Sequence, residues 1–161
     1  MSDGLSGRAK LAIVWLVLGA LVFVGAQWWI REQQQTRFQI QDGVIELRRG
    51  VDGHYHWPGT VNGRAVDFLV DTGATGTAIP TQLARELGLT LIDEVQSNTA
   101  GGLVRGHVTT AHVTLQGGVQ VDHLRITALP QLSRPLLGMN VLGRLRWRQH
   151  DGVLTIELQR T

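Results

Sequence analysis

The sequence predicts a small all-β domain with one or two short helices, preceded by a single N-terminal transmembrane helix. The length of 161 residues fits one domain plus an appendage, because single cores are usually built from about 100–200 residues. Twenty glycines, many in Asn-Gly, Asp-Gly and Gly-Gly pairs between short runs of Val, Leu, Ile and Thr, indicate many turns joining short strands. Residues 11–30 form one long apolar run.

The apolar run follows a short N-terminal tail, residues 1–10. It is apolar except for Gln27, and a helix needs about 20 such residues to cross a bilayer. A cleaved signal peptide is the alternative, because Arg8 and Lys10 form a basic start and residues 24–26 resemble a cleavage site. The length of the run and the Trp28-Trp29 pair at its end favour an uncleaved anchor.

The short N-terminus favours an orientation in which the domain lies on the extracytoplasmic side of the membrane. Residues 31–41 are polar and rich in glutamine, so we expect a juxtamembrane linker there. The folded domain is predicted over residues 42–161.

Turn signals divide this domain into its elements. Asn62-Gly63 predicts a hairpin, because both residues tolerate positive φ, and Gly88 is placed to end a helix over 81–87. A second helical turn is expected over 140–145. Strands are predicted over 43–49, 54–61, 64–70, 77–79, 91–96, 103–115, 119–129, 146–150 and 153–158.

Composition excludes several function classes. The net charge of +2 comes without a dense basic block, so no nucleic-acid partner is expected. The absence of cysteine excludes a disulfide framework, a thiolate metal site and a cysteine nucleophile. Among the six histidines, His54 and His56 share a strand face, but the others show no ligand spacing, so neither a metal site nor another cofactor is predicted.

The segment from Phe68 to Thr75 carries the most informative motif. Asp71-Thr72-Gly73 alone is ordinary turn chemistry at the end of a strand. Here, however, a strand that is apolar on both faces delivers the carboxylate. Thr72 then offers a hydroxyl, and Gly73 lets another backbone approach closely. A second apolar pair with glycine, Leu136-Leu137-Gly138, precedes the second helical turn.

The run from Phe68 to Thr75 resembles the active-site loop of aspartic peptidases. Residues 42–158 resemble the retroviral-like (retropepsin) group, and within it the bacterial membrane-anchored members, which would place the protein in a bacterial inner membrane. The ordered pair of motifs, Asp71-Thr72-Gly73 and the run from Leu136 to Leu145, carries this resemblance. Many retroviral members have an acidic residue after the alanine of this loop, whereas this chain has Thr75.

The resemblance implies a closed-barrel acid-protease fold in which Asp71 is catalytic and faces its symmetry mate in a homodimer. Thr72 would join the two loops across the dimer axis, and Gly73, Ala74 and Thr75 would complete the active-site loop. Leu136, Leu137 and Gly138 would form the second motif beside it. Thr99, Ala100, Gly101 and Gly102 would form a flap that closes over an extended protein or peptide substrate by main-chain pairing.

Peptide hydrolysis by this route needs one carboxylate to activate water and one carboxylic acid to polarise the scissile carbonyl. Two carboxyl groups that share a proton supply both. The sequence has one Asp-Thr-Gly and no Asp-Ser-Gly, so the second carboxylate must come from a second copy.

Two alternatives stay open. A module of the same fold could bind a peptide or protein without cleaving it, since fold alone does not fix function. Asp71 could also serve only to cap a turn in a structural β domain. The retained Asp71-Thr72-Gly73 set favours the peptidase, because binding an extended peptide does not require a coupled pair of acids.

Overall fold

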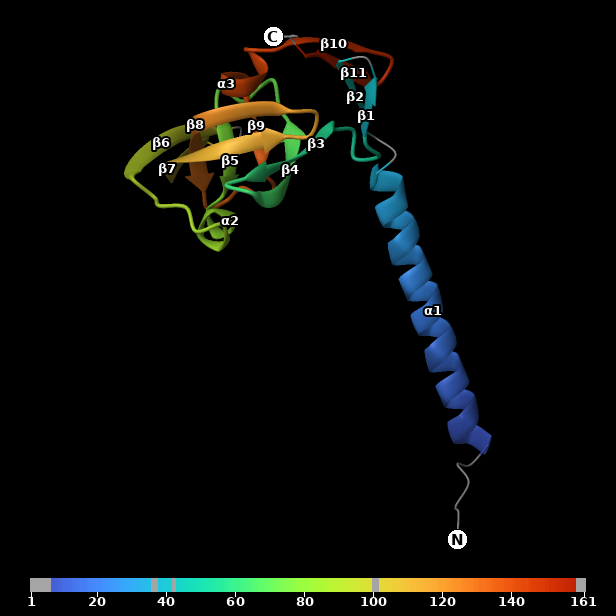
Figure 1. The fold of residues 1–161 in the computed structure, drawn as a ribbon. Coiled ribbons are helices and arrows are strands. Elements are labelled where there is room, and N and C mark those ends of the chain that lie inside the picture. Colours follow the sequence, from blue (N-terminus) through green and yellow to red (C-terminus); the bar gives the residue numbers. More distant parts are fainter. Residues whose placement is uncertain (1–6, 36–37, 42, 100–101, 159–161) are drawn as a thin grey trace. The chain divides into compact units, whose positions relative to one another are not determined.

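The computed structural model describes residues 7–35, 38–41, 43–99 and 102–158 (Figure 1). The chain divides into two compact units, Met1–Arg37 and Phe38–Thr161. The boundary lies a few residues before Asp42, where the domain was predicted to begin.

The first unit contains one helix, α1 (Gly7–Gln35), which covers the apolar run of residues 11–30. Its described apolar side chains are exposed, among them Leu16 and Phe23. No helix in the described part of the chain is long and apolar enough to span a bilayer. The run is helical, as predicted. The structure does not support the predicted transmembrane span.

The second unit begins with a strand inside the predicted linker. In the smaller of two sheets, β1 (Phe38–Gln41) pairs with β2 (Val44–Arg48), β2 with β11 (Val153–Glu157), and β11 with β10 (Arg146–His150), all antiparallel. Of the predicted linker, residues 31–35 belong to α1 and residues 38–41 form β1. Alternate residues of β2 and β11 are buried, so one face of this sheet contributes to the core.

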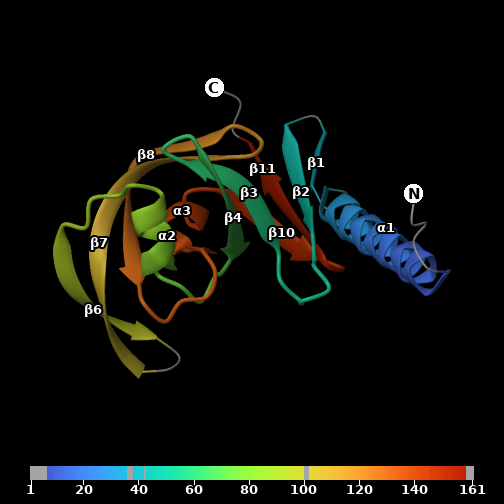
Figure 2. The same cartoon turned by 90° about the horizontal axis from the view of Figure 1, so that it is seen from below.

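The larger sheet contains seven strands in the order β3-β4-β9-β5-β8-β7-β6. Their bounds are β3 (His56–Val61), β4 (Arg64–Val70), β5 (Thr77–Pro80), β6 (Asp93–Thr99), β7 (Gly102–Leu115), β8 (Val119–Leu129) and β9 (Leu136–Leu137). β3 also pairs with β7, which makes the sheet curl (Figure 2). The domain was predicted to be all-β with one or two short helices, and the structure confirms a mostly β domain. A single closed barrel stays a prediction.

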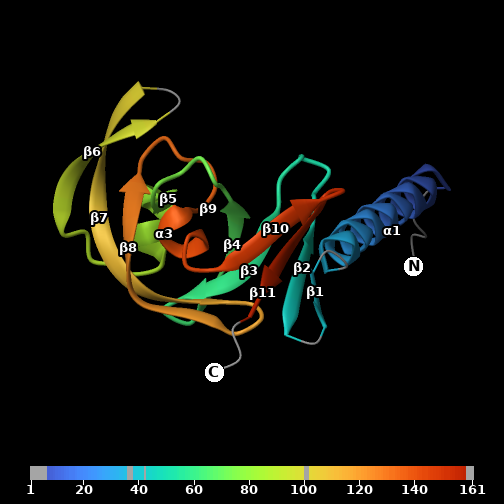
Figure 3. The same ribbon diagram turned by 90° about the horizontal axis from the view of Figure 1, so that it is seen from above.

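Two short helices accompany this sheet, as predicted: α2 (Thr81–Glu86) and α3 (Met139–Leu142). Viewed from below, both lie within the outline of the curled sheet (Figure 2), and the view from above shows α3 in the same position (Figure 3). Gly88 follows α2 with a φ of 71°, the left-handed conformation expected at the end of a helix. The Asn62-Gly63 turn has positive φ at both residues and joins β3 to β4 as the predicted hairpin.

The core fills the space between the sheet faces and the two helices. Trp57 and Phe68, which are register partners on β3 and β4, are fully buried. The Trp57 indole N–H donates to the Gln116 carbonyl oxygen at 2.8 Å, so the buried ring leaves no polar atom unpaired. Full burial of one large apolar side chain contributes about 1.5–3 kcal/mol. This core fixes β4, the strand that leads to Asp71.

Candidate active site

Asp71 follows the last residue of β4. β4 runs parallel to β9, with Leu69 opposite Leu136 and Val70 opposite Leu137. The backbone N–H of Asp71 donates to the Leu137 carbonyl oxygen at 3.0 Å, which continues this pairing by one residue. Asp71 and Leu136, the first residues of the two predicted motifs, are 65 positions apart in the sequence. The two motifs thus meet at the carboxyl ends of two parallel strands.

The loop after β4 fixes one oxygen of the Asp71 carboxylate. The Gly73 backbone N–H donates to Asp71 Oδ1 at 2.9 Å, and the Ala74 N–H donates to the Asp71 carbonyl oxygen at 3.3 Å. A Cβ atom added at Gly73 would lie 3.2 Å from Asp71 Oδ1, so a side chain there would crowd the carboxylate. Asp71 is half-buried, whereas Thr72, Gly73 and Thr75 are exposed. The site therefore presents an oriented carboxylate at the surface of one chain.

The second motif holds the other side of this loop. The Met139 N–H donates to the Ala74 carbonyl oxygen at 2.8 Å, and the Asn140 N–H donates to the Thr75 carbonyl oxygen at 3.1 Å. Gly138 is buried, and a Cβ atom added to it would lie 2.4 Å from the Gly76 carbonyl group. Only glycine fits this close approach of two backbones. The structure thus brings the Asp71 loop and the Leu136-Leu137-Gly138 motif together.

Asn140 is a residue of this site that the sequence did not single out. Its side-chain oxygen accepts hydrogen bonds from the Thr77 N–H at 2.9 Å and from the Thr77 hydroxyl at 2.8 Å. Its amide nitrogen donates to the Arg125 carbonyl oxygen at 3.0 Å. A polar side chain two residues after the glycine of the second motif was the available signal. Asn140 joins α3, β5 and β8 beneath the Asp71 loop.

The predicted flap falls on the hairpin between β6 and β7. These strands are antiparallel, with Asn98 opposite Leu103 and Thr99 opposite Gly102. Ala100 and Gly101, the two central flap residues of the prediction, lie outside the described residues. Leu103, near the start of β7, is 74% exposed, so the hairpin presents an apolar side chain to solvent.

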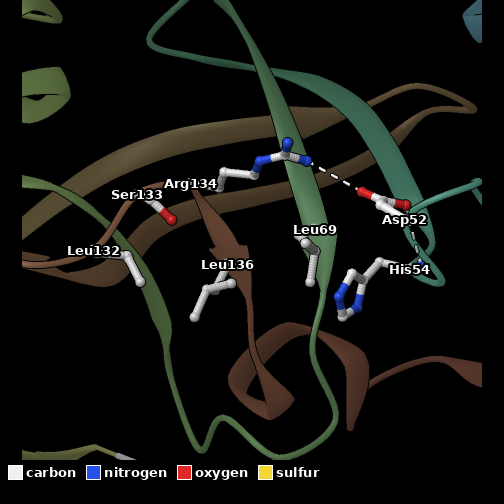
Figure 4. A pocket seen from close by; sticks show the side chains of 7 residues that line it. All are labelled: Asp52, His54, Leu69, Leu132, Ser133, Arg134 and Leu136. Carbon is white, nitrogen blue, oxygen red and sulfur yellow. Dashed lines mark hydrogen bonds and ion pairs between the residues drawn. The ribbon is translucent and has the colours of Figure 1, made fainter. Parts of the chain in front are cut away.

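A cavity of about 300 Å³ lies beside β4 and β9 (Figure 4). Leu69 and Leu136, which are paired in the sheet, belong to its lining, and each lies two residues before Asp71 or Gly138. The remaining lining residues come from the loops before β3 and β9: Asp52, His54, Leu132, Ser133 and Arg134. The cavity thus adjoins the strands that carry the candidate catalytic carboxylate.

Asp52 and Arg134, which line this cavity, belong to a larger cluster of charged side chains. His56 Nε2 lies 2.8 Å from Asp52 Oδ2, and His56 Nδ1 lies 2.8 Å from Asp67 Oδ2. Both carboxylates accept hydrogen bonds, so both ring nitrogens are best occupied by protons. The Arg134 guanidinium donates to Asp52 Oδ2 at 3.1 Å, which links the loop before β9 to the loop before β3.

The cluster shifts the pKa values of two of its members. The hydrogen bond from His56 holds the pKa of Asp52 at about 2, below its ordinary value of 3.8. Burial lowers the pKa of His56, but its hydrogen bonds to Asp52 and Asp67 outweigh burial and raise the pKa above its ordinary value of 6.5. Asp52 is therefore ionised at neutral and mildly acidic pH.

Comparisons with known proteins agree with this arrangement. A family described as "gag-polyprotein putative aspartyl protease" matches residues 57–144, which is more than half of the chain. The crystal structure of a retropepsin-like aspartic protease from Rickettsia conorii superposes with a TM-score of 0.59 at 26% sequence identity. That match covers 72% of this chain and 91% of the other.

Two curated bacterial proteins are also similar. Uncharacterized protein RP867 of Rickettsia prowazekii (strain Madrid E) is 28% identical over 131 residues, covering 74% of this chain and 53% of that protein. An uncharacterized protein in the cobV 5' region of a Sinorhizobium species is 30% identical over 113 residues, covering 65% of this chain and 47% of that protein. The chain spans about half the length of these curated relatives. The family match includes both the Asp71 loop and the Leu136-Leu137-Gly138 motif, and the chain belongs to the retropepsin-like aspartic protease family.

Proposed function

We propose that this protein is an aspartic endopeptidase in which Asp71 supplies one of two catalytic carboxylates. The observation that carries the proposal is the position of Asp71. Its backbone is held by Leu137, one carboxylate oxygen accepts the Gly73 N–H, and the side chain stays accessible. A carboxylate that only caps a turn does not require the hydrogen bonds by which Met139 and Asn140, just after the second motif, hold the other side of the loop.

We further propose that the active site is completed by a second copy of the chain. Hydrolysis needs one carboxylate to take a proton from water and one protonated carboxyl group to polarise the scissile carbonyl. Two carboxyl groups close together share one proton and fill both roles. This chain has one Asp-Thr-Gly. A symmetric homodimer would bring two Asp71 side chains together, with the exposed Thr72 hydroxyls available to join the loops across the axis.

The substrate in this proposal is an extended segment of a protein or peptide. Support comes from the hairpin of β6 and β7, which can pair its main chain with an extended substrate. Water attacks the scissile carbonyl carbon, the C–N bond breaks, and the leaving amine takes the proton that the carboxyl group donates. The products are a new carboxyl terminus and a new amino terminus.

The test compares Asp71→Asn with Asp151→Asn on denatured protein mixtures at mildly acidic and neutral pH. Asp151 is a suitable control because it is exposed and has a φ of 45°, a conformation that asparagine tolerates. Mass spectrometry counts new amino termini. We expect the parent and Asp151→Asn to cleave, with inhibition by a statine-type mimic, and Asp71→Asn to be inactive. Cleavage by Asp71→Asn at the parental rate would reject the proposal, and peptide binding without any cleavage would favour the non-catalytic module.

We also propose that residues 11–30 attach the protein to a bacterial inner membrane, with the second unit on the extracytoplasmic side. The apolar sequence of this run and the exposure of its described side chains support the proposal. The test is extraction of the full chain from membranes with carbonate, followed by protease treatment of intact spheroplasts. Release by carbonate, or protection of the second unit from protease, would contradict it.

A further inference from the structure

The cavity beside β4 and β9 has two chemically different sides. Leu69, Leu132 and Leu136 make one side apolar, and Asp52, His54 and Arg134 make the other polar (Figure 4). Ligand pockets are commonly about 300–1,000 Å³, so a cavity of about 300 Å³ accommodates a side chain rather than a length of peptide. Its position suits a substrate residue close to the scissile bond, because two of its leucines lie on the strands that hold the Asp71 loop.

Hydrogen-bonding capacity differs between the two charged groups of the polar side. Asp52 accepts from His56 and Arg134 at Oδ2 and from the His54 N–H at Oδ1, so most of its acceptor capacity is occupied. A guanidinium has five N–H donors. Within the described residues, the hydrogen bond found for Arg134 uses one nitrogen, Nη1, and the side chain is 59% exposed. Arg134 therefore has the larger unused capacity, and that capacity consists of donors.

Asp52 and His56 also restrain the orientation of the guanidinium. Asp52 is held by His56, which is in turn held by Asp67 on β4, so the acceptor that orients Arg134 is itself fixed to the sheet. A planar guanidinium that one carboxylate orients can bind a second acceptor in a fixed geometry. Asp52 and His56 are thus positioning residues for Arg134.

Resting on the proposed peptidase function, we propose that Arg134 is a specificity-determining residue. The cavity would take a substrate side chain with an aliphatic stem and a terminal carboxylate or carboxamide, as in glutamate and glutamine. The stem would pack against Leu69, Leu132 and Leu136, and the terminal oxygen would accept hydrogen bonds from Arg134. A substrate lysine would place the donors of its ammonium group beside the donors of the guanidinium, with no acceptor between them, and is therefore disfavoured.

The test uses the full chain and peptides that differ at one position flanking the scissile bond: Glu, Gln, Leu or Lys, with each flanking position varied in turn. The readout is the ratio of kcat/KM for the Glu peptide to that for the Leu peptide, measured in competition. At one position, the parent is expected to prefer Glu and Gln over Lys. Arg134→Met keeps the stem and removes the donors, so the Glu to Leu ratio should fall about tenfold, mainly through KM.

Two further variants complete the test. Arg144→Met changes another exposed arginine and should leave the ratio at its parental value. Asp52→Asn removes the charge that orients the Arg134 guanidinium. Because the guanidinium is then less well oriented, the Glu to Leu ratio should fall, but by less than in Arg134→Met. Cleavage of the Leu peptide shows that each variant is folded.

The outcomes separate the two proposals. A parent enzyme that cleaves none of the peptides or denatured proteins rejects the peptidase function and this inference with it. A parent that cleaves, with activity lost in Asp71→Asn, supports the peptidase. If that parent prefers Lys over Glu at every position, or if Arg134→Met leaves the Glu to Leu ratio unchanged, the specificity inference alone is rejected.

Discussion

The side-chain oxygen of Asn140 accepts two hydrogen bonds from one residue, Thr77, at 2.9 Å from its backbone nitrogen and 2.8 Å from its hydroxyl. Thr77 is 1% exposed, so these donors have little access to water. The pair joins the start of β5 to α3, the two elements that flank the Asp71 loop on its far side.

Replacement of Asn140 by leucine should therefore destabilise the domain. The change keeps a similar volume but leaves the buried Thr77 N–H without its acceptor, which costs about 1–3 kcal/mol. Asn140→Asp keeps an acceptor and loses the donor to the Arg125 carbonyl oxygen, so we expect intermediate stability. Urea unfolding measures both. An Asn140→Leu variant as stable as the parent would contradict this role of Asn140.

Gly138→Ala should also be destabilising, because its Cβ would lie 2.4 Å from the Gly76 carbonyl group. Overpacking of this kind typically costs about 1–3 kcal/mol. Gly76→Ala is the matched control, since a Cβ there meets no atom within 4 Å. Thermal unfolding and peptidase assays compare the two variants. We expect Gly138→Ala to lose activity and stability together, and equal behaviour of the two variants would show that close backbone approach does not matter here.

The His56 cluster predicts a defined dependence of stability on pH. Because its folded-state pKa is raised, His56 contributes stability that is fully present below 6.5 and is lost as pH rises through the folded-state value. Asp52 contributes stability that is present above 3.8 and is lost as pH falls through about 2. The difference in Tm between the parent and His56→Gln should therefore be largest between pH 3.8 and 6.5.

His150→Gln serves as the control for this measurement, because His150 and its partner Asp151 are 85% and 87% exposed. Ion pairs at such exposure contribute little. A Tm difference for His56→Gln that grows as pH rises above 6.5 would contradict the assigned direction.

Much of the fold could be predicted from the sequence because turn residues bound its strands. The strands over 64–70, 119–129 and 146–150 have the predicted limits, and each begins or ends beside a glycine turn or a short helix. β1 was not predicted, because its two apolar residues alternate with glutamine in a polar segment. The pairing of β1 with β2, rather than its own composition, stabilises it as a strand.

The candidate site was predicted in part. The Asp71 loop and the Leu136-Leu137-Gly138 motif were found from local patterns, and the structure places them in contact. The Asn140 to Thr77 bonds join residues 63 positions apart, and the Asp52 to Arg134 bond joins residues 82 positions apart. Such contacts depend on how elements that are distant in the sequence pack together, and local sequence patterns do not predict that packing.

Dependence on a second copy predicts that activity falls on dilution. Dilution below the dimer dissociation constant separates the two Asp71 side chains, so specific activity should decline in step with the dimer fraction. Parallel sedimentation and activity measurements over the same concentration range follow both quantities. Constant specific activity in samples that sediment as monomers would contradict a shared site.

Mixing subunits tests the central proposal, a site shared by two Asp71 side chains, most directly. Parent and Asp71→Asn chains are unfolded together, refolded at equal amounts and assayed at fixed total concentration. If both carboxylates are required, random pairing leaves about a quarter of the dimers active. Activity near a quarter of the parental value is the predicted result. Activity near one half would mean that each chain acts with its own Asp71 alone, and would contradict the shared site.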